Sequence, residues 1–147
     1  MDPLTITIIT TIATGITMKV LEKTGENIGE GLWDKTSKFL KSLKKESSKT
    51  ELAISKAVDG EIDYSKTVSE LKKIASSNDD FKKVVDELVI AVSENEDEKV
   101  KSSINERIKE IQLALNIEDN SNTIINIEKA VNVVRGVQNI ETQNIHF

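Results

Sequence analysis

The chain of 147 residues contains no cysteine, a single proline and few aromatic side chains. Without cysteine it can form neither a disulfide nor a thiolate metal site, and it offers no attachment point for a prenyl or palmitoyl group. We therefore expect a cytoplasmic protein in the resting state. Scarce proline and an aromatic content of 3%, together with abundant lysine and glutamate, favour an all-α fold.

The residue patterns required for catalysis are also missing. Gly25, Gly29 and Gly31 are not followed by the Gly-Lys-Ser/Thr ending of a phosphate-binding loop. No carboxylate pair stands out from the acidic background, and the single histidine, His146, has no plausible nucleophile or metal ligand near it in the sequence. We therefore expect no enzymatic activity, no metal and no cofactor. The net charge of −5 argues against nucleic-acid binding.

Residues Pro3 to Met18 include no charged side chain and are rich in isoleucine and threonine. As a helix this segment would be ~24 Å long, shorter than the ~20 residues needed to cross a hydrocarbon core. It is either a core helix or a membrane-inserting helix, and the two interpretations are compatible, because a core helix can be releasable. Gly15 would permit the close approach of another backbone. In the second interpretation the membrane-inserting residues are Leu4, Ile6, Ile8, Ile9, Ile12 and Ile16.

Lysines recur at roughly three-residue spacing shortly after this segment, and no acid lies between Lys35 and Lys45. A lysine stripe on a helix is usually a solvated face. Because the stripe follows an apolar segment, the alternative interpretation is that these lysines are attracted to anionic lipid headgroups. The residues expected to contact headgroups are Lys35, Lys38, Lys41 and Lys45.

From Ile28 to Leu115, apolar residues recur with helical periodicity. One helix should begin near Asp63, and Ser76–Asp79 should end it. The pattern predicts an antiparallel bundle of four to six helices over residues 1–115, a linker over 116–130 and a flexible tail over 131–147. After Leu115 the only stretch that could still be helical is Ile124–Val134. Core-facing positions are expected at Val68, Leu71, Ile74, Phe81, Val84, Val85, Leu88, Val92, Val100, Ile104, Ile108, Ile111 and Leu115.

The tail combines β-branched residues with amides and has two charged residues apart from the chain terminus and His146. Such segments can stack in cross-β order, although a disordered end or a single strand added to a partner are alternatives. The residues predicted to form an amyloid motif are Val131, Val133, Val137, Gln138, Asn139, Ile140, Gln143, Asn144, Ile145 and Phe147.

The two ends together resemble a known family. The resemblance lies in MDPLTI, the KTGENIGE turn and the LWDKTSKFL run at the N-terminus, and in TIINIEKAVNVVRGVQNIETQNIHF at the C-terminus. These segments are similar to cyanobacterial and other bacterial proteins of the Bell type. Those proteins are relatives of the fungal HeLo domain and of the four-helix domain of the necroptosis executor pseudokinase. The middle of the chain is similar only in its helical character.

The resemblance implies an executor of regulated cell death in bacterial immunity. Its helical domain would move from the cytoplasm to the cell membrane, bind lipids and self-associate on activation. The lysine pattern indicates that these lipids are anionic. Its tail would be templated by a matching amyloid motif on a sensor of the nucleotide-binding oligomerisation (NLR) type. The alternative from another class is a non-toxic adaptor, in which the bundle is an interaction module recruited through the same tail.

Overall fold

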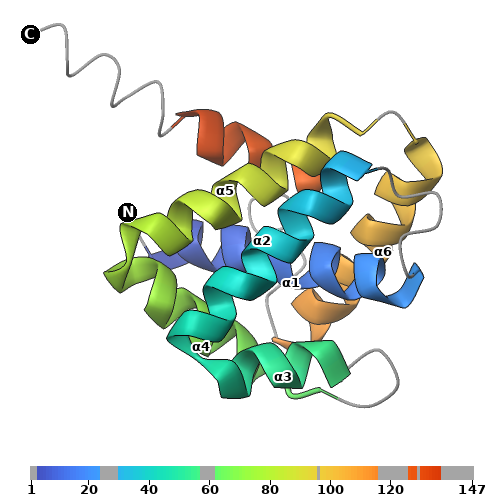
Figure 1. The fold of residues 1–147 in the computed structure, drawn as a ribbon. Coiled ribbons are helices and arrows are strands. Elements are labelled where there is room, and N and C mark those ends of the chain that lie inside the picture. The colour runs from blue at the N-terminus through green and yellow to red at the C-terminus, as the bar shows by residue number, and fades with distance from the viewer. Residues whose placement is uncertain are drawn as a thin grey trace, which may run out of the picture.

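The computed structural model describes residues 3–23, 30–56, 62–95, 97–115, 126–128 and 130–136 (Figure 1). Within these ranges the chain is helical and has no strand, which confirms the predicted all-α class. Residues 127–128 and 130–136 are also helical and are called the C-terminal helix below. The other helices are α1 (Pro3–Lys23), α2 (Glu30–Glu46), α3 (Ser48–Lys56), α4 (Tyr64–Ser77), α5 (Asp79–Ser93) and α6 (Glu98–Ala114).

Short polar side chains define several helix starts. Asp63 accepts a hydrogen bond from the Lys66 N–H at 3.1 Å, and Asn78 accepts one from the Phe81 N–H at 3.0 Å. Asp97 begins α6 in the same way. Each cap satisfies an N–H that the first helical turn leaves without an intrahelical partner. The predicted helix boundaries at Asp63 and at Ser76–Asp79 are therefore confirmed.

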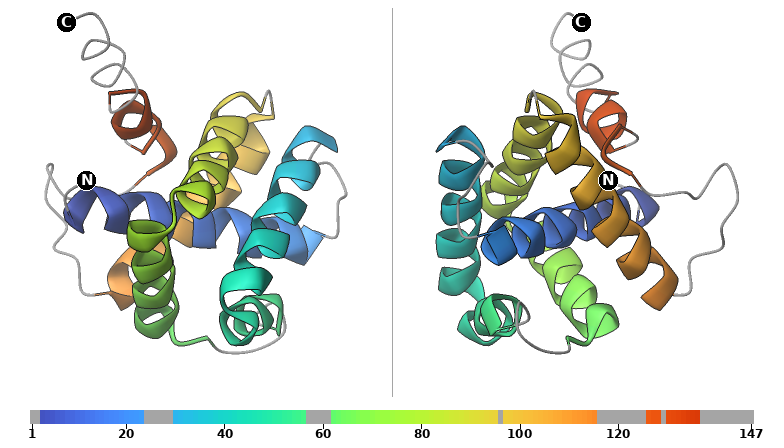
Figure 2. Two further views of the ribbon diagram at one scale, coloured as in Figure 1. Left: turned by 60° about the vertical axis from the view of Figure 1, so that its left-hand side comes forward. Right: turned by 90° about the vertical axis from the view of Figure 1, so that its right-hand side faces the viewer.

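Helix α1 runs through the middle of the molecule and contacts all five of the other numbered helices (Figure 2). Every residue from Ile8 to Met18 is buried, so this helix has no solvent-facing side along that stretch. Around it, Phe39 of α2 and Phe81 of α5 join the core with ring centroids 5.7 Å apart. The predicted buried faces of α4, α5 and α6 are confirmed, with Val68, Leu71 and Phe81 among the buried residues, but Val84 and Leu115 are only partly buried.

The C-terminal helix packs on this core, beside α5 and α6, and its start differs from the predicted domain boundary. Val131 and Val134 are buried, and Val133 is partly buried against the core. The sequence analysis placed Val131 and Val133 in a tail separate from the body. The structure corrects this placement: the three- and four-residue spacing of Ile127, Ala130, Val131 and Val134 makes an apolar stripe, and its burial outweighs the low helix propensity of valine.

The remaining predicted motif residues lie outside the described residues. They are Val137, Gln138, Asn139, Ile140, Gln143, Asn144, Ile145 and Phe147. The predicted linker is described only at 126–128 and at Ala130, where it is already part of the C-terminal helix apart from Asn126.

Candidate functional site

The isoleucines predicted to insert into a membrane are enclosed by the other helices. Ile8, Ile9, Ile12 and Ile16 expose 3% or less of their surface, and Ile6 exposes 8%. The side chain of Leu4 lies outside the described residues. The five described members of the candidate membrane-inserting set therefore lie in the hydrophobic core.

Two of the four buried threonines of α1, Thr10 and Thr14, form hydrogen bonds within the helix. The Thr10 hydroxyl donates to the Ile6 carbonyl and the Thr14 hydroxyl donates to the Thr10 carbonyl, each at 2.8 Å. These bonds run to the preceding turn of the same helix, so they persist wherever the helix goes. The hydroxyls of Thr11 and Thr17 are buried with no hydrogen-bond partner among the described residues. Helix α1 therefore depends very little on its neighbours for hydrogen bonds along this stretch.

Gly15 lies where α1 packs tightly against Ile108 of α6. A Cβ added at Gly15 would lie 2.7 Å from Ile108 Cγ1 and 3.5 Å from the Ile108 backbone nitrogen. Ile108 is fully buried, so its side chain has no open space to move into. The predicted close approach of a second backbone at Gly15 is confirmed, and glycine is needed there for lack of room.

The described ion pairs of α1 lie at its carboxy-terminal end. We call the group formed by Lys19, Glu22, Tyr64, Arg107 and Glu110 the Arg107 clamp. The Glu22 carboxylate accepts a hydrogen bond from Arg107 Nη2 of α6 at 2.9 Å and lies 3.4 Å from Lys19 Nζ. Arg107 also donates to the Tyr64 hydroxyl of α4 at 3.4 Å and to Glu110 at 3.3 Å. One guanidinium thus joins α1, α4 and α6. The sequence analysis did not find this clamp, because no local spacing connects residues that lie 85 positions apart.

Electrostatics within the clamp favour the charged forms. Burial alone would raise the pKa of Glu22, but the hydrogen bond from Arg107 and the positive charge of Lys19 outweigh it and lower the pKa below its ordinary value of 4.5. Burial alone would likewise lower the pKa of Arg107, whereas its hydrogen bonds to Tyr64 and Glu22 raise it. The Glu22–Arg107 contact is therefore an ion pair at neutral pH.

The predicted lysine stripe divides into two groups on α2. Lys35 and Lys38 lie 3.4 Å and 3.7 Å from the Glu87 carboxylate of α5, which partly neutralises them. Lys41 and Lys45 are exposed, and neither forms an ion pair within the described part of the chain. Glu87 therefore lies beside part of the lysine stripe, and Lys41 and Lys45 remain exposed without an ion pair in the described part of the chain.

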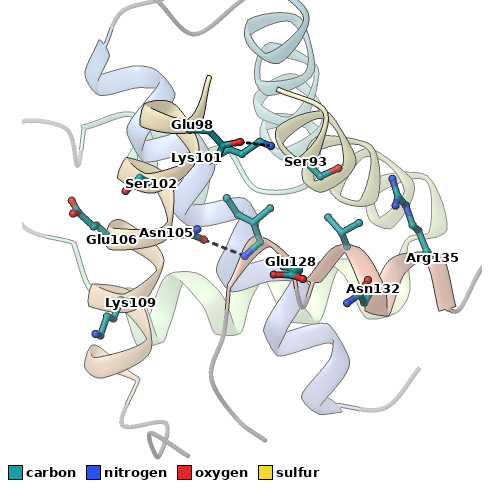
Figure 3. A pocket seen from close by; sticks show the side chains of 12 residues that line it. Ser93, Glu98, Lys101, Ser102, Asn105, Glu106, Lys109, Glu128, Asn132 and Arg135 are labelled. Carbon is teal, nitrogen blue, oxygen red and sulfur yellow. Dashed lines mark hydrogen bonds and ion pairs between the residues drawn. The ribbon is translucent and has the colours of Figure 1, made fainter. Parts of the chain in front are cut away.

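A cleft of about 730 Å³ lies between the end of α5, α6 and the C-terminal helix (Figure 3). At its centre Asn105 accepts a hydrogen bond from the Ile127 N–H at 3.2 Å and so caps the C-terminal helix. Acidic and basic side chains alternate along its walls, with Glu98 and Lys101 paired at 3.6 Å. Because its walls carry both signs of charge, the cleft favours neither anionic nor cationic ligands. It marks where the C-terminal helix docks on the body.

A comparison of the chain with protein-family models, curated proteins and solved structures finds no match. Among the described residues, no helix is both long enough and apolar enough to cross a membrane. The same residues contain no cluster of three or more histidine, cysteine, aspartate or glutamate side chains that could hold a metal ion.

Proposed function

We propose that the protein is a membrane-targeting executor of regulated cell death, with α1 as the membrane-active element stored in the core. The observation that supports this best is that α1 is buried from Ile8 to Met18 while the Thr10 and Thr14 hydroxyls bond within the helix. A helix of this kind can exchange a protein core for lipid without losing these hydrogen bonds. The C-terminal tail is the proposed trigger.

The free energy of burying its isoleucines determines which environment α1 can enter when it leaves the core. Burial of one isoleucine side chain contributes ~1.5–3 kcal/mol, so the five described isoleucines from Ile6 to Ile16 contribute about 7–15 kcal/mol in total. That is comparable to the whole stability of a domain, roughly 5–15 kcal/mol. Release of α1 into water is therefore strongly unfavourable. Release into the apolar part of a bilayer recovers this term, so the membrane is the destination that makes release feasible.

The exposed lysines Lys41 and Lys45 give the body a means of approaching an anionic surface. A lysine near such a surface contributes ~1 kcal/mol to binding, and salt weakens the attraction. Lys35 and Lys38 contribute after their contacts with Glu87 are broken or shared. Binding of the body would bring α1 close to the bilayer before it leaves the core.

The proposed trigger is cross-β stacking of tails, templated by a sensor that carries a matching motif. Stacking gathers many bodies at one place and raises their effective concentration. Val131 and Val133 belong to a packed helix, so a stack that includes them requires the C-terminal helix to leave the body first. Its departure would uncover part of the core that surrounds α1, and this links tail assembly to release.

The alternative function is a non-toxic adaptor in which α1 never leaves the core, and complete burial of α1 is equally expected for it. Deletion of Pro3–Met18 cannot separate the two functions, because removal of the central helix would unfold the body in both. An aspartate at Ile9 or Ile12 has the same drawback, since it would bury an unpaired charge.

Dye release from vesicles tests the proposed function. Full-length protein is added to anionic or neutral vesicles, with preformed fibres of a peptide covering residues 131–147 or with a scrambled peptide as the control. We expect release from anionic vesicles, an increase with matching fibres and a decrease with salt. Fibres that recruit the protein without any dye release would instead support the adaptor.

A further inference from the structure

Charged contacts of α1 are concentrated at one end. No side chain between Ile6 and Met18 is charged, and the stretch is held by apolar packing and by hydrogen bonds within the helix. Lys19 and Glu22 then bring two opposite charges within 3.4 Å of each other, and Glu22 contacts Arg107 at 2.9 Å. The two ends of α1 are thus attached to the body by different kinds of interaction.

The charged end is attached to a well-supported part of α6. Arg107 holds Glu22 while also contacting Tyr64 and Glu110, so its guanidinium stays in place if α1 shifts. The neighbouring residue on α6, Ile108, packs against Gly15. Beyond Gly15, toward Ile6, α1 has no charged side chain that could pair with the body.

These attachments respond differently to an apolar environment. Isoleucine side chains stay out of water when they move from the core into lipid, whereas an ion pair moved there would lose hydration or its partner. The segment from Ile6 to Met18 can therefore leave the body, while Lys19 and Glu22 favour the aqueous side, where Arg107 already binds Glu22.

We infer that the amino-terminal segment of α1 leaves the body first. The helix then pivots on the Arg107 clamp, which keeps the carboxy-terminal end of α1 on α6. This inference rests on the proposed function, because it states how the stored helix is released. It adds a direction to the movement and identifies Arg107 as the positioning residue that holds the pivot.

Thiol accessibility in solution tests the pivot, and the cysteine-free chain leaves each introduced thiol as the only one. The matched substitutions are Ile9→Cys and Val20→Cys, at positions that expose 2% and 1% of their surface. Labelling rates of the full-length variants report local opening at each end of α1. We expect faster labelling of I9C than of V20C.

A second substitution separates the pivot from ordinary fraying of a helix end. Glu22→Gln should speed labelling of V20C roughly fivefold, the effect expected for loss of a partly exposed ion pair, and leave I9C unchanged. Arg107→Gln should act similarly and should not add to Glu22→Gln. Glu110→Gln is the matched control, because it removes an Arg107 partner on α6 without touching α1, and it should leave both rates unchanged.

Equal labelling of I9C and V20C, or no effect of Glu22→Gln on V20C, would overturn the pivot. Circular dichroism would confirm that each variant is folded under the labelling conditions. The labelling needs no membrane, so its outcome is independent of the vesicle experiment. Failure of dye release with the expected labelling pattern would refute the proposed function and keep the pivot as a property of the fold.

Discussion

Substitution of Gly15 by alanine tests how tightly α1 is packed on α6. The new Cβ would lie 2.7 Å from Ile108 Cγ1, well inside van der Waals contact, and Ile108 is fully buried. Overpacking of a core costs about 1–3 kcal/mol, whereas glycine to alanine inside a helix gains about 1 kcal/mol. We expect Gly15→Ala to lower the free energy of unfolding by about 1 kcal/mol, the midpoint of this difference.

Urea unfolding followed by circular dichroism measures this effect, and Gly31→Ala is the matched control. An added Cβ at Gly31 in α2 meets no atom within 4 Å, so this substitution should be neutral or stabilising. In an Ile108→Ala background the obstructing Cγ1 is absent, and Gly15→Ala should then stabilise the protein. The packing argument is refuted if the Gly15→Ala variant is at least as stable as the wild type and if Gly15→Ala changes the free energy of unfolding with the same sign in both backgrounds.

Three further predictions concern the surface, the clamp and the tail. Replacing Lys41 and Lys45 together by glutamine should weaken binding to anionic vesicles roughly 30-fold at low salt, at ~1 kcal/mol per lysine; equal binding in co-sedimentation would leave them as ordinary solvated residues. The folded-state pKa of Glu22 is lowered, so its ion pair stabilises the fold above the ordinary pKa of 4.5 and the contribution is lost as pH falls through the folded value. Glu22→Gln should therefore flatten the dependence of unfolding free energy on pH below about 4.5, and an unchanged slope in acid titration would contradict this. A peptide of residues 131–147 should form cross-β fibres detected by fibre diffraction, and Ile140→Pro should block them because proline removes a ladder donor; a wild-type peptide that stays monomeric and does not respond to seeds would exclude the trigger.

Local patterns were sufficient to predict much of the fold. The caps at Asp63 and Asn78 and the apolar spacing from Val100 to Ile111 follow from interactions within a few residues, and the structure contains all of them. The close approach at Gly15 was also predictable, because a glycine inside an apolar helix has few other uses.

Features that depend on distant partners could not be predicted from the sequence. The burial of the α1 threonines depends on the helices packed around them, which are distant in the sequence. Glu87 and Arg107 reach across helices to Lys35 and Glu22, and no periodicity reveals such pairs. Val131 appeared as part of a tail because its β-branched neighbourhood favours strands, whereas burial on the body makes it helical.

The most direct test of α1 release is a reversible lock between α1 and α6. Gly15→Cys combined with Ile108→Cys introduces one thiol on each side of the α1–α6 contact, where an added Cβ at residue 15 lies 3.6 Å from the Ile108 Cα. Loss of free thiol on oxidation shows that the disulfide has formed. The same preparation is then tested for dye release from anionic vesicles, oxidised and after reduction, with circular dichroism to confirm folding in both states. The account predicts little release when oxidised and recovered release when reduced, and equal release in the two states would contradict it.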